Sequence, residues 1–161
     1  MGEAAIMDDS RDSDFSLNGF SLWIHGWERD SADFWDNNWL DITARFDTGG
    51  RMGSATVVVL GTVLHATDLE YAANTSAKLA EGLQAVAEFA TMEPGFEIKL
   101  EALSEGRIGF TLEMVPGVDE MYEYSAKIDQ SYLPPAVAAL KSMMKRFGPR
   151  GERPSAAPDS G

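Results

Sequence analysis

The chain has 161 residues, about the size of one domain with one hydrophobic core, which excludes a two-domain enzyme. Apolar residues make up 44% of it and charged residues 24%, so the composition is globular and excludes wholesale disorder or a fibre. With 26 acidic and 13 basic side chains the formal net charge is −13. A negative field of this size repels phosphate backbones, so we predict no direct nucleic-acid partner.

The sequence carries no sign of a membrane segment or of export. Its longest apolar run, 55–60, is far shorter than the roughly 18–20 residues that a membrane span requires. Residues 1–9 have neither the basic region nor the apolar stretch of a signal peptide. Cysteine is absent, which is typical of a reducing compartment and excludes thiolate metal sites and cysteine nucleophiles. We therefore expect a cytoplasmic protein without membrane contact.

Both ends of the chain differ in composition from the middle. Residues 1–14 are small, acidic and without period, and residues 148–161 are rich in glycine and proline. Such segments cannot bury enough apolar surface to fold, so we predict two disordered tails around a single domain over residues 15–147. The charge is also uneven, because residues 1–129 carry −16 and residues 130–161 carry +3.

The sequence pattern predicts strands in the first half of the domain. Residues 20–27 and 39–46 alternate between apolar side chains and others, the period of two expected of a strand. Glycines in the turn at 47–50 accept a positive φ, and the apolar run 54–64 follows. We therefore predict a hairpin between the second and third strands.

The second half begins with a change of period. Thr67 is predicted as the N-cap of a helix that runs to about Thr91, because apolar residues then recur at helical spacing. Alternation returns in three further segments, 96–102, 108–114 and 122–129, and a last helix is predicted over 133–147. The predicted fold class is α+β: one antiparallel sheet of about six strands in βββ-α-βββ-α order, with two helices packed on one face.

All four tryptophans fall within residues 23–39, among several aspartates. The strand alternation places Trp23, Trp27 and Trp39 on the face opposite Leu22 and Leu40. If the helices cover the leucine face, the tryptophans form an outer aromatic patch rimmed by acids, which is typical of an interaction hot spot. The alternative is that they fill a core or lie under the 28–36 loop. The predicted partner-binding residues are Trp23, Trp27, Asp30, Asp33, Asp36 and Asp41.

The sequence contains no recognisable catalytic or metal-binding motif. His25 and His65 are the only imidazoles, and neither belongs to a recognisable nucleophile or zinc motif. The aspartates at 30–36 lack the spacing and the closing glutamate of an EF-hand loop. We therefore predict no enzyme activity, no metal and no cofactor.

Two motifs resemble a known family. Asp36-Asn37-Asn38-Trp39-Leu40 is similar to the Asp-x-Asn-Trp-Leu of the WapI-type immunity proteins of bacterial toxin–immunity loci. The segment 129–135, Asp-Gln-Ser-Tyr-Leu-Pro-Pro, resembles that family's Asp-Gln-Thr-Tyr-Leu-Pro-Pro, with serine for threonine. The resemblance covers about residues 15–147. It implies a cytoplasmic, non-enzymatic protein that neutralises a cognate toxin by binding it.

Two hypotheses for function follow. The first is an immunity-type protein whose acidic aromatic surface docks on a toxin domain, with a basic, nuclease-like toxin favoured by electrostatic steering. The alternative is a small-molecule-binding or regulatory α+β module with an aromatic pocket lined by Tyr122, Tyr124 and tryptophan.

Overall fold

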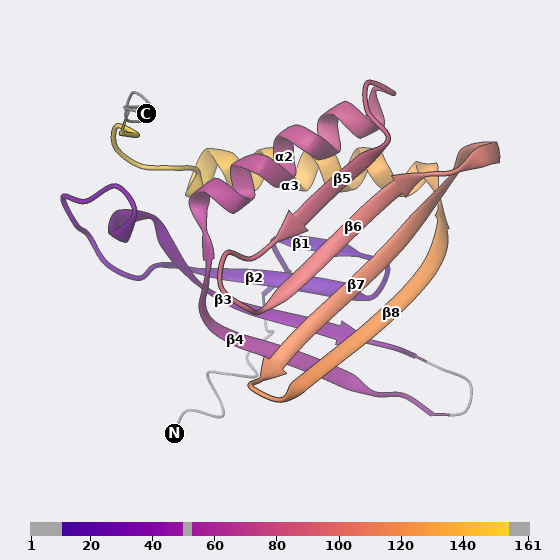
Figure 1. Cartoon of the computed structure of the whole chain (residues 1–161), viewed down its shortest axis with the longest axis horizontal. Helices are drawn as coiled ribbons and strands as arrows, with labels where there is room; N and C mark the ends of the chain where they lie inside the picture. The colour runs from indigo at the N-terminus through magenta and orange to yellow at the C-terminus, as the bar shows by residue number, and fades with distance from the viewer. Residues whose placement is uncertain (1–10, 50–52, 155–161) are drawn as a thin grey trace, which may run out of the picture.

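The chain folds as two halves with the same order of elements, four antiparallel strands followed by a helix (Figure 1). A computed structural model describes residues 11–49 and 53–154. The first half contains β1 (Phe15–Leu17), β2 (Phe20–Trp27), β3 (Trp39–Asp47), β4 (Thr56–His65) and α2 (Ala66–Ala80). The second contains β5 (Val86–Ala90), β6 (Phe96–Ala102), β7 (Arg107–Gly117), β8 (Glu120–Asp129) and α3 (Leu133–Phe147). Single-turn 3-10 helices are η1 (Asp36–Asn38), η2 (Ser104–Gly106) and η3 (Gln130–Tyr132).

The α+β class is confirmed, but the predicted single six-stranded sheet is wrong. The described strands form two four-stranded antiparallel sheets, ordered β1-β2-β3-β4 and β5-β6-β7-β8. The prediction missed β1 because three residues are too few to show a period. It read β5 as part of the preceding helix, because its small apolar residues also fit helical spacing. In the structure α2 ends at Ala80, and Gly82 follows with a φ of 75°.

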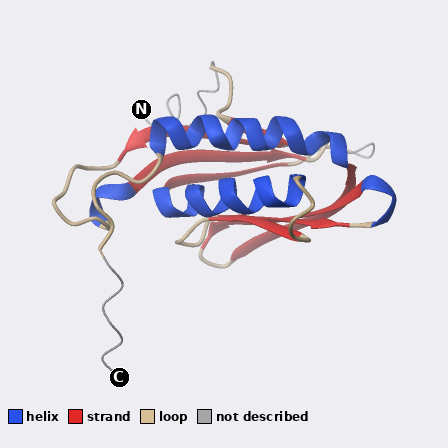
Figure 2. Cartoon of the chain, turned by 90° about the horizontal axis from the view of Figure 1, so that it is seen from above, coloured by secondary structure: helices blue, strands red, loops and turns tan. Residues whose placement is uncertain are grey.

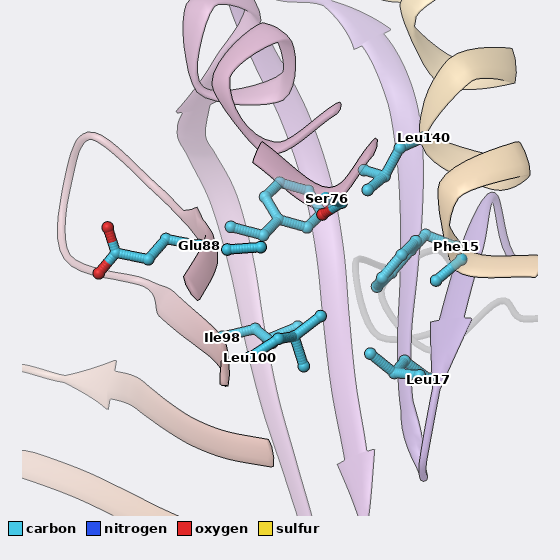
Figure 3. A pocket seen from close by; sticks show the side chains of 10 residues that line it. Phe15, Leu17, Ser76, Glu88, Ile98, Leu100 and Leu140 are labelled. Carbon is cyan, nitrogen blue, oxygen red and sulfur yellow. The ribbon is translucent and has the colours of Figure 1, made fainter. Parts of the chain in front are cut away.

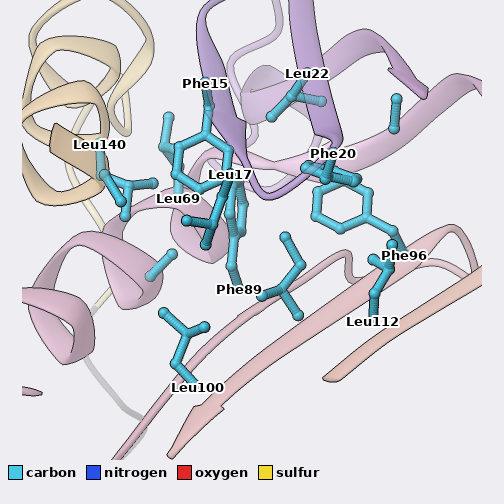
Figure 4. Packing of buried hydrophobic residues seen from close by; sticks show 14 of the residues in the cluster. Phe15, Leu17, Phe20, Leu22, Leu69, Phe89, Phe96, Leu100, Leu112 and Leu140 are labelled. Carbon is cyan, nitrogen blue, oxygen red and sulfur yellow. The ribbon is translucent and has the colours of Figure 1, made fainter. Parts of the chain in front are cut away.

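The two sheets face each other across one shared core (Figure 4). Aromatic pairs join them: the ring centroids are 5.5 Å apart for Phe15 and Phe89, and 4.9 Å apart for Phe20 and Phe96. The inward positions predicted by alternation are buried in β2, β3, β6 and β7. The helices α2 and α3 lie side by side and close the side of the sheets where β1 and β5 run, instead of covering one face of a single sheet (Figures 1 and 2).

The described pocket between the sheets leaves little room for a ligand. Bounded by the sheets and helices and lined by residues such as Phe15, Ile98 and Leu140, it has a volume of about 10 Å³, enough for one water molecule at most (Figure 3). Tyr122 and Tyr124, which the alternative hypothesis assigns to an aromatic pocket, pack against the buried ring of Phe46, and Tyr122 also lines an open groove beside β4.

The helix ends differ in how well the sequence predicted them. α3 begins at Leu133 with Pro134 and Pro135 in its first turn and ends at Phe147, as expected. The N-cap of α2 is His65 and not Thr67. The backbone N–H of Thr67 donates to the His65 ring, and Asp68 accepts the N–H of His65, which completes a capping box.

The shared core predicts a large loss of stability when a ring is removed from it. Phe20 is fully buried and contacts both Phe15 and Phe96. Phe20→Ala should lower the free energy of unfolding by about 3–5 kcal/mol, measured by urea denaturation. The exposed Val118 provides the control, since Val118→Ala should change stability by less than about 0.5 kcal/mol. Equal effects of the two changes would contradict a core shared between the sheets.

Candidate functional site

The predicted aromatic patch does not form, because a β-bulge moves Trp27 to the other face of its sheet. The β2–β3 ladder shifts register between Ile24 and Gly26, and Gly26 has a φ of 142°. Before the shift Trp23 lies opposite Thr43, and after it Trp27 lies opposite the buried Leu40. Directly opposed residues point to the same side of a sheet, so Trp23 and Trp27 point to opposite sides.

Trp23 is buried under the chain that precedes β1, and only 7% of it is exposed. Its ring nitrogen Nε1 donates to the carbonyl of Arg11 over 2.9 Å. The Arg11 guanidinium donates to the carbonyl of Ile24, and the carboxylate of Asp14 accepts the N–H of Ile24. Arg146 at the end of α3 also pairs with Asp14, at 3.0 Å. Residues 11–14 therefore pack against β2, and little of the Trp23 surface is exposed.

The loop over residues 28–38, called here the acidic loop, is held in place by Arg150. The Arg150 guanidinium donates to the carbonyls of Arg29 and Asn37 and pairs with the Asp30 carboxylate at 2.8 Å. Its centre lies 4.0 Å from the centroid of the Trp27 ring, a cation–π contact. Arg150 belongs to the segment 148–161 that the sequence predicts to be a tail, so the described part of that segment, 148–154, contacts the domain. Residues 1–10 and 155–161 of the two predicted tails lie outside the described residues.

Asn38 joins the same two segments from inside. Its side chain is fully buried, donates to the carbonyls of Phe34 and Arg150, and accepts the backbone N–H of Arg150 at 2.7 Å. These bonds satisfy the amide of a buried side chain that would otherwise be costly to desolvate. The acidic loop therefore has a defined position despite its polar composition.

His65 anchors the acidic loop to the start of α2. It is fully buried, and its ring lies 5.2 Å from that of Trp35 and 5.0 Å from that of Trp39. Because Nδ1 accepts the N–H of Thr67, Nε2 is assigned as the donor to the carbonyl of Trp35, over 3.0 Å. The residue thus has a structural role, and it connects the loop with the helix.

The four aspartates predicted to bind a partner differ in their contacts and positions. Asp30 is engaged by Arg150, and a carboxylate oxygen of Asp33 accepts the backbone N–H of Asp36 at 3.1 Å. Asp36 and Asp41 are exposed. The structure therefore brings Asp30, Asp33 and Asp36 together on the acidic loop, whereas Asp41 lies on β3.

Trp35 is the residue of this surface that sequence reasoning missed. It is 45% exposed and lies on the acidic loop between Asp33 and Asp36. One side of its ring is supported by His65, and Phe34 contacts it edge to face at 5.1 Å. Alternation could not find it, because it belongs to no strand. Its aspartate neighbours were the available signal.

Asp68 connects the start of α2 with the chain that follows β5. One carboxylate oxygen accepts the backbone N–H groups of His65 at 2.9 Å and Met92 at 2.8 Å. Burial raises the pKa of Asp68, while these two hydrogen bonds and the nearby His65 act in the opposite direction. The carboxylate therefore braces the corner on which His65 and the acidic loop depend.

The described residues contain no cluster of three or more His, Asp or Glu side chains arranged to hold a metal ion. Within the same ranges, 11–49 and 53–154, no helix has the length and apolarity needed to cross a bilayer.

Fold and site together define a two-sheet α+β protein that presents an ordered acidic loop with a half-exposed tryptophan. The chain belongs to the immunity protein WapI-like family, whose sequence profile matches residues 11–148. The resemblance seen in the two sequence motifs is thereby confirmed. No curated protein sequence matches the chain.

Two solved structures are similar to this chain over most of its length. The crystal structures of Trypanosoma bruciei MRP1/MRP2 align over 83% of this chain and 88% of theirs, with 13% identity and a TM-score of 0.44. A guide-RNA-binding protein complex bound to a gRNA aligns over 81% of this chain and 92% of its own, with 14% identity and a TM-score of 0.43.

The contacts of Arg150 predict that its replacement loosens the acidic loop. Lysine keeps the charge but cannot reproduce the planar, forked set of donors, so Arg150→Lys should speed amide hydrogen exchange across 28–38 by about tenfold or more. Arg29→Lys is the matched control, because Arg29 is exposed and pairs only with its neighbour Glu28 among the described ion pairs. Unchanged exchange in Arg150→Lys would show that the loop is held by other contacts.

The raised pKa of Asp68 predicts a pH-dependent difference in stability between the protein and Asp68→Asn. From the ordinary Asp value upwards, the unfolded chain loses this proton before the folded one, so the Asp68 contribution to stability falls as pH rises through the folded pKa. Asparagine does not titrate, so the stability of the variant relative to the wild type, measured by urea unfolding, should increase as pH rises above the ordinary Asp pKa. Asp129→Asn should show the opposite trend, because hydrogen bonds from Ser131 lower the pKa of Asp129. A difference independent of pH for Asp68→Asn would contradict the buried-carboxylate account.

Proposed function

We propose that this chain neutralises a basic, nuclease-like toxin domain by binding it, without catalysis, through the acidic loop and the exposed side of Trp35. Family membership supports the neutralising role. The observation that supports this surface is that a loop carrying Asp33, Trp35 and Asp36 faces solvent while Arg150 and His65 hold its backbone. In this proposal Trp27 supports the loop through Arg150, Trp23 stays buried, and Asp41 contributes charge from β3.

A fixed loop suits tight binding because less conformational freedom is lost when the complex forms. Trp35 offers a large, half-exposed ring whose other side is already packed, the kind of residue that dominates protein interfaces. Carboxylates around it attract a basic surface and raise the association rate, as does the net charge of −13. The acidic loop therefore combines an anchor with electrostatic steering.

The proposed setting is the cytoplasm, where a toxin domain would be met by an inhibitor without disulfides. The described pocket between the sheets gives the small-molecule hypothesis no support, because its volume is about 10 Å³.

The first test is capture of the partner. The purified full chain serves as bait in a lysate of the source organism, washed at moderate salt, and bound proteins are identified by mass spectrometry. The proposal expects a basic toxin domain at one-to-one stoichiometry. Capture of nothing from a lysate in which the toxin is shown to be present would contradict it.

The captured partner then allows the charge effect to be measured. Asp36→Lys should lower the association rate about tenfold at low salt and much less at high salt, because screening weakens steering between exposed charges. Glu101→Lys makes the same change of charge on the exposed side of β6, on the other sheet, and should have a smaller effect. Stopped-flow mixing at two ionic strengths measures both. Equal effects of the two variants would locate the binding surface elsewhere.

A further inference from the structure

The described sheets have four edge strands, and they differ sharply in length and charge. β1 and β5 have 3 and 5 residues and run beside the helices (Figure 1). β8 has 10 residues, among them Glu120, Glu123, Lys127 and Asp129. β4 also has 10 residues but carries no Asp, Glu, Lys or Arg. Charged side chains and short length are the usual protection of a sheet edge, so β4 is the one long edge in the described chain without it.

The unpaired backbone groups of β4 can be assigned from the hydrogen bonds around it. The N–H of Thr48 donates to the carbonyl of Ala55, while the N–H of Asp47 donates to Gly19 on the other side of β3. Bonded and non-bonded pairs alternate in an antiparallel ladder, so Thr56, Val58 and Leu60 are non-bonded pairs with β3. Their N–H and C=O groups therefore point away from the sheet.

One end of this edge is hydrogen-bonded to another segment. The carbonyl of Val63 accepts the N–H of Glu93 at 3.3 Å. Between Thr56 and Leu60, no backbone hydrogen bond of the described residues joins the outer edge of β4 to another segment. Leu60 is 41% exposed, and Thr56 is also exposed. A segment of about five residues is thus available for pairing.

A groove with both polar and apolar lining lies beside this free segment. It has a volume of about 380 Å³ and is lined by β4 residues 56–58 together with Pro116, Glu120, Met121 and Tyr122 of the β7–β8 turn region. The turn reaches the side of β4 (Figure 1). At the turn, Val118 is 98% exposed and Met121 is 63% exposed. A free edge with an adjoining groove is the arrangement by which proteins bind an added strand, with backbone bonds giving affinity and the groove giving specificity.

The acidic residues near the groove favour a basic binding partner. Glu120 lines it, and the neighbouring Asp119 is exposed, whereas Arg45 beside Val58 is paired with Asp47. A second copy of the chain also has a net charge of −13 and would be repelled by this acidic border. A strand that alternates apolar residues and carries lysine or arginine at its ends complements both the groove and its acidic border.

We propose that β4 binds an extended strand of a basic partner protein, which extends the first sheet by one strand alongside Thr56–Leu60. The apolar side chains of that strand enter the groove, and a basic residue lies beside Glu120. The partner's identity rests on the proposed function, under which the strand belongs to the toxin domain. The binding chemistry itself does not require that function.

The test uses a synthetic peptide in which valine and threonine alternate between pairs of lysines. Hydrogen exchange of individual amides is followed by NMR on the full chain. Without peptide the Val58 and Leu60 amides should exchange fast, while those of Val57 and Val59, which face β3, exchange slowly. Saturating peptide should slow the Val58 and Leu60 amides by about tenfold or more and leave the other two unchanged. A peptide that leaves the Val58 and Leu60 amides unprotected overturns the proposal.

Variants separate backbone pairing from other effects. Val58→Pro removes an outward N–H that contributes nothing to the β3 ladder, so the fold should persist while peptide protection of Leu60 is lost. Val58→Thr keeps the N–H and should still bind. A peptide methylated at its backbone nitrogens should fail on the unaltered protein, which keeps the test valid if Val58→Pro does not fold. A second peptide carries glutamates in place of the lysines and should bind more weakly. If both peptides bind with equal affinity, the proposed selection by charge is wrong.

Two further outcomes identify other occupants or separate this inference from the proposed function. Protection of Val58 that rises with protein concentration in the absence of peptide would show a second copy at the edge and overturn the proposal. If Val58→Pro still captures the toxin with unchanged affinity, the assignment of the strand to the toxin is wrong. Failure of the acidic-loop variants to alter capture would contradict the proposed binding surface and leave the β4 edge unaffected.

Discussion

Burial of the two sheets against each other is the constraint on which the rest of this structure depends. Neither four-stranded sheet has a second apolar layer of its own, and the rings of Phe15, Phe20, Phe89 and Phe96 join them in one core. With the inner faces committed to that contact, partners are left with outer faces, edges and loops. The small interior pocket is a result of the same packing.

The acidic loop obtains its order from segments far away in the sequence. Arg150 reaches it from beyond α3, and the Asn38–Arg150 hydrogen bonds span 112 positions. His65 fixes the same loop from the corner between β4 and α2. A polar segment without a core of its own is therefore positioned by a guanidinium, an amide and an imidazole, all in contact with the domain.

The sequence predicted the features that depend on neighbouring residues and missed those that depend on contacts between distant residues. Alternation located the inward faces of β2, β3, β6 and β7, and two prolines located the start of α3, because these signals are local. The bulge at Gly26 was invisible to alternation, which counts one residue per step, so Trp27 was placed on the wrong face. β1 and β5 were too short to show a period. The role of Arg150 depends on contacts that only the folded chain creates.

The exchange of helices between the two halves has a consequence for synthesis. α2 ends the first half but packs along β5 of the second, and α3 ends the second half but packs on β1 of the first. As the chain leaves the ribosome, the first sheet is complete while the surface it must cover has not been made. Its apolar face stays open until β5 to α3 emerge, so nascent chains are vulnerable to aggregation during that interval, and folding is completed only with the last helix.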